Sequence, residues 1–558
     1  MDISTSPASN QTKPEGALWT VRNQNNPFQP KCSINELSTE ILEHIFKLGV
    51  EMEVEGEEGK EDDDGWEDIS DDNSDDDDMS DSSTNNAGSG ERPLFQILIS
   101  HVCRHWRDVA LNLHVFWTSI DFDNFDSDMT VQLAKAKVFI DRAQGLPLKV
   151  YIDCILHEDT DKESPYNQMN QTRKQIVDGT SKPDPFLSLT HILDLVEPEV
   201  YHWGELNFHF STYRYVQSLL SRLHKLPSAP LLKEFHLFHH EDCDFFEFFC
   251  GNDKTYYFPF HGNAPLLESA IFWGVHIDWD KSLSFLHGLR EFELSYHAKD
   301  VLPSYNTFIQ IIKNSPNLRS LSLSVSGPAL AKGAQFDDEG QWGPEPIEIP
   351  SLHYLMLHSQ EPQYASALIQ HFYFPNLRGL SLDFKEEDYT SFARKLLVPV
   401  KGRSKTILSG LKTLKISGLP CDAATVEAIL EQLMELKVLY LKCFGSEEMV
   451  FFKKLINPSA GRKKQGKTQI NTGENTLSKI FCPVLETLAI IPVRSESEIK
   501  TLVRARKAGG APLKTLRLSY GNGITIKMEE WLWNHVEVVE FFEPQDEVLA
   551  VQNGCLLL

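Results

Sequence analysis

Side chains that could bind a metal ion or carry a proton are most densely grouped in one short stretch. The stretch contains His236, His239, His240, Glu241, Asp242 and Cys243. Zinc sites draw their ligands from pairs at standard spacings, and no second ligand pair follows at such a spacing. A strand followed by a polar turn therefore explains this stretch better than a metal site does.

Motifs of known reaction types are absent from the sequence. It has no glycine-rich phosphate loop, no Gly-x-Ser-x-Gly nucleophile elbow and no His-Glu-x-x-His zinc motif. We therefore expect a binding protein that has no catalytic residue, no cofactor and no metal.

Length and composition predict several domains in an intracellular protein. The chain has 558 residues, which exceeds what one hydrophobic core usually organises, and 41% of them are hydrophobic. Its nine cysteines are scattered, and no apolar run near the N-terminus could serve as a signal peptide, so we expect reduced thiols. No apolar run approaches the length of about 18 residues that a membrane span needs. The expected location is cytoplasmic, nuclear or both, without membrane contact.

The negative charge of the chain is concentrated in one tract. Between Glu51 and Asp81 the sequence holds 18 acidic residues and one lysine, whereas the net charge of the whole chain is −27. Such a tract repels itself, so residues 51–91 are expected to be a disordered insertion, and the polar residues 1–30 a disordered N-terminus. The tract is either a tolerated loop expansion or an acidic interaction segment for a basic partner.

A leucine pattern, L-x-x-L-x-L, recurs through most of the chain at intervals that are mostly 25 to 35 residues. This pattern is typical of leucine-rich repeats, in which the leucines of each copy point inward from a short strand. The nine clear copies lie at 230–237, 288–294, 316–323, 350–357, 375–382, 410–416, 435–441, 483–490 and 512–518, and 265–271 is a degenerate member that lacks the full pattern. Helical patterns between the copies, such as 305–312 and 424–430, would form the convex side.

The predicted fold class is therefore α/β, with an irregular leucine-rich-repeat solenoid, a horseshoe, over residues 191–545. A tail follows at 546–558. Residues 121–190 are expected to connect this solenoid to the N-terminal region. They contain a helical pattern near 131–139 and a strand pattern at 147–152.

In each copy the residue between the last two leucines should point to the concave face. These residues are His236, Glu293, Ser322, Met356, Ser381, Lys415, Tyr440, Ala489 and Arg517. Their mixed types suit recognition of a protein target. They argue against nucleic acid as a ligand, because a nucleic-acid groove would be uniformly basic.

Two short apolar helical patterns flank the acidic insertion. The first consists of Ile41, Leu42, Ile45 and Phe46, and the second of Leu98, Val102, Trp106, Val109 and Leu113. Neither piece is large enough to fold alone, so the two must pack on each other or on a partner.

This combination resembles an F-box, the helical module that docks on the Skp adaptor of cullin–RING ubiquitin ligases. The resemblance is carried by Leu37, Glu40, Ile41, Leu42, Ile45, Phe46, Val102, Cys103, Arg104, Trp106 and Arg107. The sequence from Phe116 to Ile120 is similar to the tail of many fungal F-box proteins, which places the domain at 31–120. Ser38 stands where the family usually has a proline, and the long insertion is a second departure.

The resemblance implies an adaptor-binding surface with the small core beneath it. Its expected residues are Leu37, Ile41, Leu42, Ile45, Phe46, Leu98, Val102, Cys103, Trp106 and Arg107. The implied function is non-catalytic: the F-box would hold a Skp-type adaptor, and through it a cullin–RING ligase, while the repeats hold a protein substrate. The alternatives are a leucine-rich-repeat scaffold whose N-terminal helices only cap the solenoid, and an acidic-tract protein that binds chromatin or histones.

Positive charge gathers in the C-terminal part of the chain. Residues 401–520 hold 21 Lys and Arg against 10 Asp and Glu. A cluster around Arg462 lies in an expanded gap between two repeats. It could be a solvated loop, a nuclear-localisation signal or a surface that attracts an acidic segment.

Overall fold

The computed structural model describes most of the chain and divides it into two compact units. The first contains residues up to 50 together with 88–112, and the second contains the rest; residues 51–57, which this division counts with the second unit, continue a helix that begins in the first and are described with it. The described residues are 37–57, 94–123, 125, 128–155, 185–240, 256–330, 342, 345–384, 387–442, 449–456, 480–491, 495–519 and 524–542. Glu241 to Cys243, the cluster around Arg462, and residues 1–30, 58–91 and 546–558 lie outside them.

The first unit, called here the helical unit, consists of α1 (Thr39–Glu57), α2 (Phe95–Ser100) and α3 (Arg104–Asn112). Helix α1 begins after Ser38, whose carbonyl oxygen accepts the N–H groups of Ile41 and Leu42 at 3.1 Å each. Gly49 lets α1 approach Phe95 closely, because a Cβ there would lie 2.3 Å from the Phe95 ring. Disorder was predicted from residue 51, but α1 continues to Glu57, so that prediction is wrong for 51–57.

The second unit, called here the sheet unit, is built on fourteen described strands that form one parallel sheet. They are β1 (Ser119–Phe122), β2 (Leu148–Cys154), β3 (Trp203–Phe210), β4 (Glu234–His239), β5 (Ser269–Trp273), β6 (Glu291–Ser295), β7 (Ser320–Ser324), β9 (Tyr354–His358), β11 (Gly379–Asp383), β12 (Thr413–Gly418), β13 (Val438–Lys442), β14 (Thr487–Ile491), β15 (Thr515–Ser519) and β16 (Val538–Phe542). Each pairs with the sheet strands before and after it in the chain. A separate pair is formed by β8 (Ile347–Glu348) and β10 (Phe372–Tyr373).

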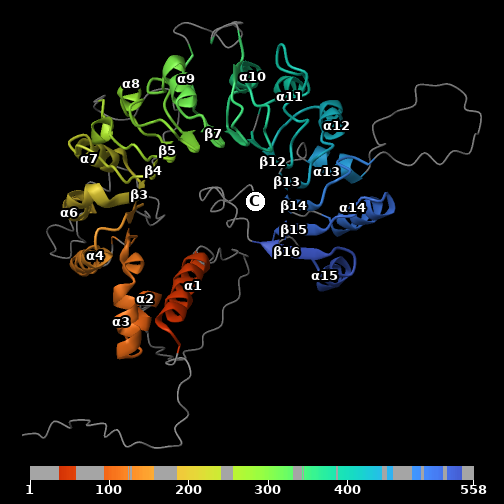
Figure 1. Ribbon diagram of the computed structural model, residues 1–558. Coiled ribbons are helices and arrows are strands. Elements are labelled where there is room, and N and C mark those ends of the chain that lie inside the picture. Colours follow the sequence, from red (N-terminus) through yellow and green to blue (C-terminus); the bar gives the residue numbers. More distant parts are fainter. Residues whose placement is uncertain are drawn as a thin grey trace, which may run out of the picture. The chain divides into compact units, whose positions relative to one another are not determined.

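Helices connect most of these strands and lie along one side of them (Figure 1). The α-helices are α4 (Met129–Ala143), α6 (Pro185–Val196), α7 (Tyr213–Leu223), α8 (Trp279–Ser282), α9 (Tyr305–Lys313), α10 (Pro362–His371), α11 (Thr390–Leu396), α12 (Ala423–Gln432), α13 (Met449–Ile456), α14 (Glu496–Ala508) and α15 (Ile526–Trp533). Short 3-10 helices are η2 (His114–Trp117), η3 (Glu197–His202) and η4 (Pro259–Gly262). The helices predicted at 305–312 and 424–430 are confirmed as α9 and α12.

The core of the sheet unit is made by two rows of apolar side chains that run across the strands in register. From β3 to β15 every member of both rows is at most 3% exposed. The first row contains Leu206, Phe235, Ala270, Phe292, Leu321, Leu355, Leu380, Leu414, Leu439, Leu488 and Leu516, and the second, two residues further along each strand, contains Phe208, Leu237, Phe272, Leu294, Leu323, Leu357, Leu382, Ile416, Leu441, Ile490 and Leu518. The L-x-x-L-x-L pattern marks ten of these strands correctly, from β4 to β15, because alternation on a strand sends its last two apolar residues to one face.

The sheet begins earlier in the chain than the sequence indicated. Residues 121–190 were expected to connect two domains, yet strands β1 and β2 belong to the continuous sheet. The predicted strand at 147–152 and helix at 131–139 are confirmed as β2 and α4, but they are part of the sheet unit. The stretch from Phe116 to Ile120, predicted to close the F-box, also lies in this second unit, where it forms part of η2 and β1.

Four neighbouring strands end in the same unusual backbone turn. The residues directly after β5, β6, β7 and β9 are Gly274, Tyr296, Val325 and Ser359, with φ of 62°, 57°, 49° and 48°. Their N–H groups donate to the carbonyl oxygen of the last residue of the next strand, at 2.8 to 3.0 Å. For a β-branched residue such as Val325, this conformation costs about 1–3 kcal/mol.

Candidate interaction surfaces

Helix α1 carries a stripe of apolar side chains that is exposed. Ile41, Ile45, Leu48 and Met52 follow one another at helical spacing and are 49%, 38%, 44% and 70% exposed. We call these four residues the apolar stripe. The first two were predicted from the sequence; the last two were missed, although the same spacing points to them.

Two further apolar residues of the helical unit are exposed beside short helices. Leu98 on α2 is 48% exposed, and Val102, between α2 and α3, is 60% exposed. Both were predicted as adaptor-binding residues. Folded proteins usually bury side chains of this kind, and a group of exposed ones is typical of a binding surface.

Other predicted residues form the core of the helical unit. Leu42 and Phe46 are 0% and 1% exposed. The Phe46 ring packs against the half-buried Trp106, with centroids 5.1 Å apart and planes at 60°. The Trp106 Nε1 group is buried, and it has no hydrogen-bond partner in the part of the chain that the structure describes. These three residues therefore support the exposed surface from below.

The remaining predicted adaptor residues have different surroundings. The Cys103 Sγ atom accepts the Trp106 N–H at 3.5 Å, so the half-buried Cys103 caps the start of α3. Leu37 is half-buried before α1, and Arg107 is exposed on α3.

The predicted concave residues of the sheet unit lie in a single register row. From β4 to β15 this row reads His236, Ile271, Glu293, Ser322, Met356, Ser381, Lys415, Tyr440, Ala489 and Arg517. It alternates with the two core rows along each strand, so its members point away from the core. We call the side of the sheet that carries this row the open face. Asn207 on β3, Ile271 on β5 and Glu540 on β16 extend the row but were not predicted.

Burial along this row is greater than a solvent-facing row would suggest. Ser322, Ser381, Lys415 and Tyr440 are only 5% to 8% exposed, whereas Arg517 is exposed. The Lys415 Nζ atom lies 5.0 Å from the centre of the Tyr440 ring, a cation–π contact. Tyr440, Ala489 and Ile491 also form a small apolar cluster against which Phe542 packs.

A histidine, a serine and a glutamate are linked on neighbouring strands of the open face. His236 Nε2 lies 2.9 Å from Ser269 Oγ, and this hydroxyl donates to Glu291 Oε2 at 2.9 Å. His236 must therefore donate its own proton to the serine. A serine nucleophile needs the opposite direction, with the imidazole accepting the hydroxyl proton, so this chain of bonds is a structural brace.

Burial keeps the charged forms of several groups on this face unfavourable. Burial lowers the pKa of His236 to about 4. Burial, and then the neighbouring His240, lowers the pKa of His209 to about 3. His209 Nδ1 lies 3.1 Å from His240 Nε2, and the His209 ring stacks on Phe238 with centroids 4.3 Å apart. Burial also raises the pKa of Glu293, which accepts the Trp273 N–H at 2.6 Å.

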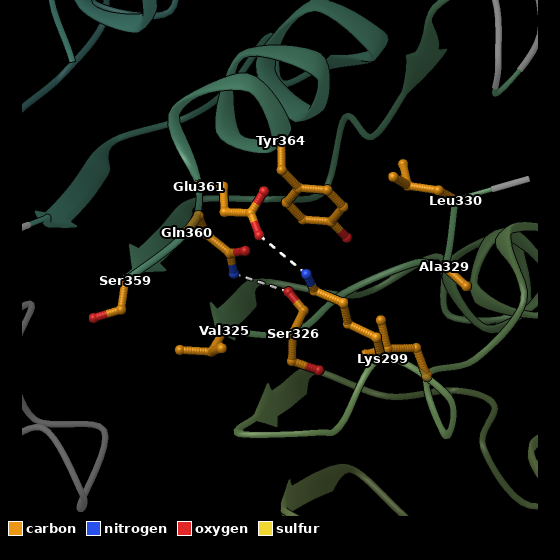
Figure 2. Close-up of a pocket in the computed structure, with 10 residues that line it drawn as sticks. Lys299, Val325, Ser326, Ala329, Leu330, Ser359, Gln360, Glu361 and Tyr364 are labelled. Atoms are coloured by element: carbon orange, nitrogen blue, oxygen red, sulfur yellow. Dashed lines mark hydrogen bonds and ion pairs between the residues drawn. The ribbon is translucent and has the colours of Figure 1, made fainter. Parts of the chain in front are cut away.

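A pocket of about 220 Å³ opens beside the ends of β7 and β9 (Figure 2). Its lining is mainly apolar, and the Lys299–Glu361 ion pair lies in it at 3.3 Å. Gln360 fixes the wall because its Nε2 group donates to the carbonyl oxygens of Leu323 and Ser326, at 3.0 and 2.9 Å. Pockets for whole small ligands are usually about 300–1,000 Å³, so this one suits a single large side chain.

The described residues contain no group of three or more His, Cys, Asp or Glu side chains placed to hold a metal ion. None of the helices in those same parts of the chain is long and apolar enough to cross a membrane.

Comparisons of the sequence with known proteins do not assign a family or a function to these surfaces. No protein-family model matches the chain. The curated proteins contain no significant match to it either.

Proposed function

We propose that this protein is the substrate-recognition subunit of a Skp–cullin–F-box ubiquitin ligase. The helical unit would bind the Skp-type adaptor, and through it the cullin–RING ligase. The sheet unit would be a leucine-rich-repeat solenoid of horseshoe shape that binds a protein target. Such a protein acts in the cytoplasm, the nucleus or both.

One observation carries this proposal. The helical unit has a buried core of its own, in Leu42, Phe46 and Trp106, yet it also exposes the apolar stripe, Leu98 and Val102. Removing apolar area from water contributes about 25 cal/mol per Å², so a partner that covers these side chains gains stability from each of them. An apolar docking surface on a small helical module is what adaptor binding requires.

The role of this chain in ubiquitin transfer would be to hold and orient the target. Proximity and orientation can lower a reaction barrier by about 7–11 kcal/mol without any bond-making group on the positioning protein. The open face supports this role because the members of its central row that reach solvent, among them Met356, Arg517 and Glu540, differ in chemical type. A mixed surface of this kind suits a protein partner.

The decisive experiment is capture of a purified Skp-type adaptor by the full chain. Ile45→Asp places a charge in the centre of the apolar stripe, where an unpaired carboxylate would have to lose its water. We expect adaptor affinity to fall by about 100-fold or more, since burial of such a group costs several kcal/mol. Exposed His44, the preceding residue on α1, supplies the matched control: His44→Asp adds the same group to the same helix and should leave capture nearly unchanged.

The outcomes separate the proposal from its alternatives. Equal capture by wild type, Ile45→Asp and His44→Asp would reject the adaptor-binding surface. A repeat scaffold capped by the helical unit predicts no capture at all, together with a loss of sheet stability when residues 1–112 are removed. An acidic-tract protein predicts histone binding that disappears when residues 58–91 are replaced by a neutral linker.

A further inference from the structure

A basic side chain precedes each of six consecutive strands of the sheet. These residues, which we call the basic row, are Arg290, Arg319, His353, Arg378, Lys412 and Lys437 before β6, β7, β9, β11, β12 and β13. Their backbones are held in line, because the N–H of each donates to the carbonyl oxygen of the one before it, at 2.7 to 2.9 Å. The row is therefore a fixed array across the sheet.

The two ends of the basic row are neutralised, but its centre is not. Arg290 pairs with Glu268 at 3.3 Å, and Lys412 pairs with Glu435. Lys437 lies 3.9 Å from Glu486. Arg319 and Arg378 are both exposed, and neither has a carboxylate within ion-pair distance among the residues that the structure describes.

On β7, β9, β11 and β12 the open-face positions next to the basic row carry no acid, whereas the adjacent β6 places Glu291 and Glu293 in register with Ser320 and Ser322. The residues that follow the row are Ser320, Tyr354, Gly379 and Thr413, and those of the central row are Ser322, Met356, Ser381 and Lys415. The acid that β11 does contribute, Asp383, lies at the far end of that strand, 3.7 Å from His358. Strands β3, β4 and β6 differ, since Glu205, Glu234 and Glu291 occupy the position that Ser320 occupies on β7.

Such a row is not explained by stability of the fold. Like charges on directly adjacent strands destabilise a sheet, and a surface serving only the fold would alternate their signs. Arginine presents a planar fork of donors that matches a carboxylate with two parallel hydrogen bonds. Arg319 and Arg378 precede strands that are two positions apart in the sheet, hence about 10 Å from each other.

We propose that the basic row, centred on Arg319 and Arg378, binds an extended acidic segment of the protein target. An extended chain in the polyproline II conformation has three residues per turn and rises about 3.1 Å per residue, so carboxylates three residues apart lie on one side of it, about 9 Å from each other, close to the spacing of the two arginines. The inference rests on the proposed function, because it takes the sheet unit to be the target-binding part, and it adds the chemistry of the target.

The test uses the full chain and a fluorescent twelve-residue peptide with glutamate at every third position and serine between. A second peptide carries glutamine in place of each glutamate. Arg319→Gln/Arg378→Gln should weaken binding of the acidic peptide by about fivefold, the sum expected for two exposed ion pairs. The glutamine peptide should bind weakly to both proteins, and added salt should reduce the difference between the peptides.

The matched control is Lys313→Gln/Lys507→Gln. Lys313 and Lys507 are exposed in the last turns of α9 and α14, on the helix side of the sheet, so this variant has the same net charge as the arginine variant. We expect it to bind the acidic peptide as wild type does. Equal losses in the two variants, or no loss in either, would overturn the proposal. Thermal unfolding of both proteins checks that neither has lost its fold.

Two further measurements make the result specific. A single-stranded RNA of twelve nucleotides is the competing polyanion. Tighter binding of this RNA than of the peptide, with the same loss in the arginine variant, would assign the row to nucleic acid and reject our proposal. Adaptor capture by the arginine variant should be unchanged. If wild type binds the peptide but captures no adaptor, the acidic-segment site stands and the ligase role fails.

Discussion

Leucine and isoleucine meet opposite environments in the two units of this protein. In the sheet unit, Leu294, Leu380 and Leu439 are fully buried, as are most of the residues in register with them. In the helical unit, Ile41, Leu48 and Leu98 are 49%, 44% and 48% exposed. The sheet unit can bury its apolar rows because every strand has neighbours and a layer of helices. The three helices of the helical unit offer far less cover, and this difference supports the proposal that the helical unit docks on a partner.

The same substitution in the two units tests this difference most directly. Leu380→Ala removes a fully buried side chain and should lower the free energy of unfolding of the sheet unit by about 2–5 kcal/mol. Leu98→Ala should change stability by less than about 0.5 kcal/mol, because the side chain already faces water. Urea denaturation of the full chain measures both. A large stability loss from Leu98→Ala would mean that this residue is packed, and the proposed docking surface would shrink accordingly.

Acidic pH should lower the free energy of unfolding of the sheet unit by a smaller amount. The pKa of His236 is lowered to about 4 by burial, whereas an unfolded histidine titrates near 6.5. The unfolded chain therefore takes up the proton first as the pH falls. This lowers the free energy of unfolding by about 1–2 kcal/mol between pH 7.5 and pH 5, and the loss is complete only below about pH 4.

His236→Gln tests the origin of that pH dependence. Its amide can still donate to Ser269, but it does not titrate in this range, so the stability of the variant should fall less steeply with acid. Exposed His105 provides the control substitution His105→Gln, which should keep the wild-type slope. Urea denaturation of the three proteins at pH 7.5 and pH 5 gives the six values needed. Parallel slopes in wild type and His236→Gln would assign the acid sensitivity to another group.

The smallest effect should come from the acidic tract. Residues 58–91 link α1 to α2, and the entropy of closing a loop grows only slowly with its length. Replacing them with a short glycine–serine linker, which leaves α1 intact to Glu57, should keep adaptor affinity within about threefold. A soluble variant of this kind that no longer binds the adaptor would place the tract in the interface.

The repeat pattern alone was enough to predict the strands from β4 to β15 and the central row of the open face. Side chains alternate along a strand, so the residue between two core leucines must point to the opposite face. His236, Glu293 and Arg517 could therefore be assigned to the open face from their spacing alone. Strand β3 was not predicted because aromatic residues, such as Trp203, occupy core positions in it, and β2 was predicted as a strand but not as part of this sheet. Their membership depends on pairing between distant segments, which no local pattern reveals.

The candidate surfaces were predicted less completely. Extending the apolar spacing of α1 by two turns would have found Leu48 and Met52. Aligning the repeats at the position after their first leucine would have found Arg319 and Arg378. Burial of Lys415 and Tyr440 could not be predicted, because it depends on contacts between different strands, such as the contact of Lys415 with the Tyr440 ring and the packing of Phe542 on Tyr440. The division of Ile45 and Phe46 between surface and core likewise depends on where Trp106 packs.

The order of the strands has a consequence for how the chain acquires its fold. Each strand of the sheet pairs only with the strands next to it along the chain, and no long-range crossover is needed. Because sheet strands that pair are also consecutive in the chain, each new strand needs only the one before it in place in order to pair. During synthesis the sheet can therefore lengthen by one strand at a time as the ribosome releases each segment. A chain interrupted at an inner repeat would still carry a folded N-terminal part, whose last strand leaves a free edge for aggregation.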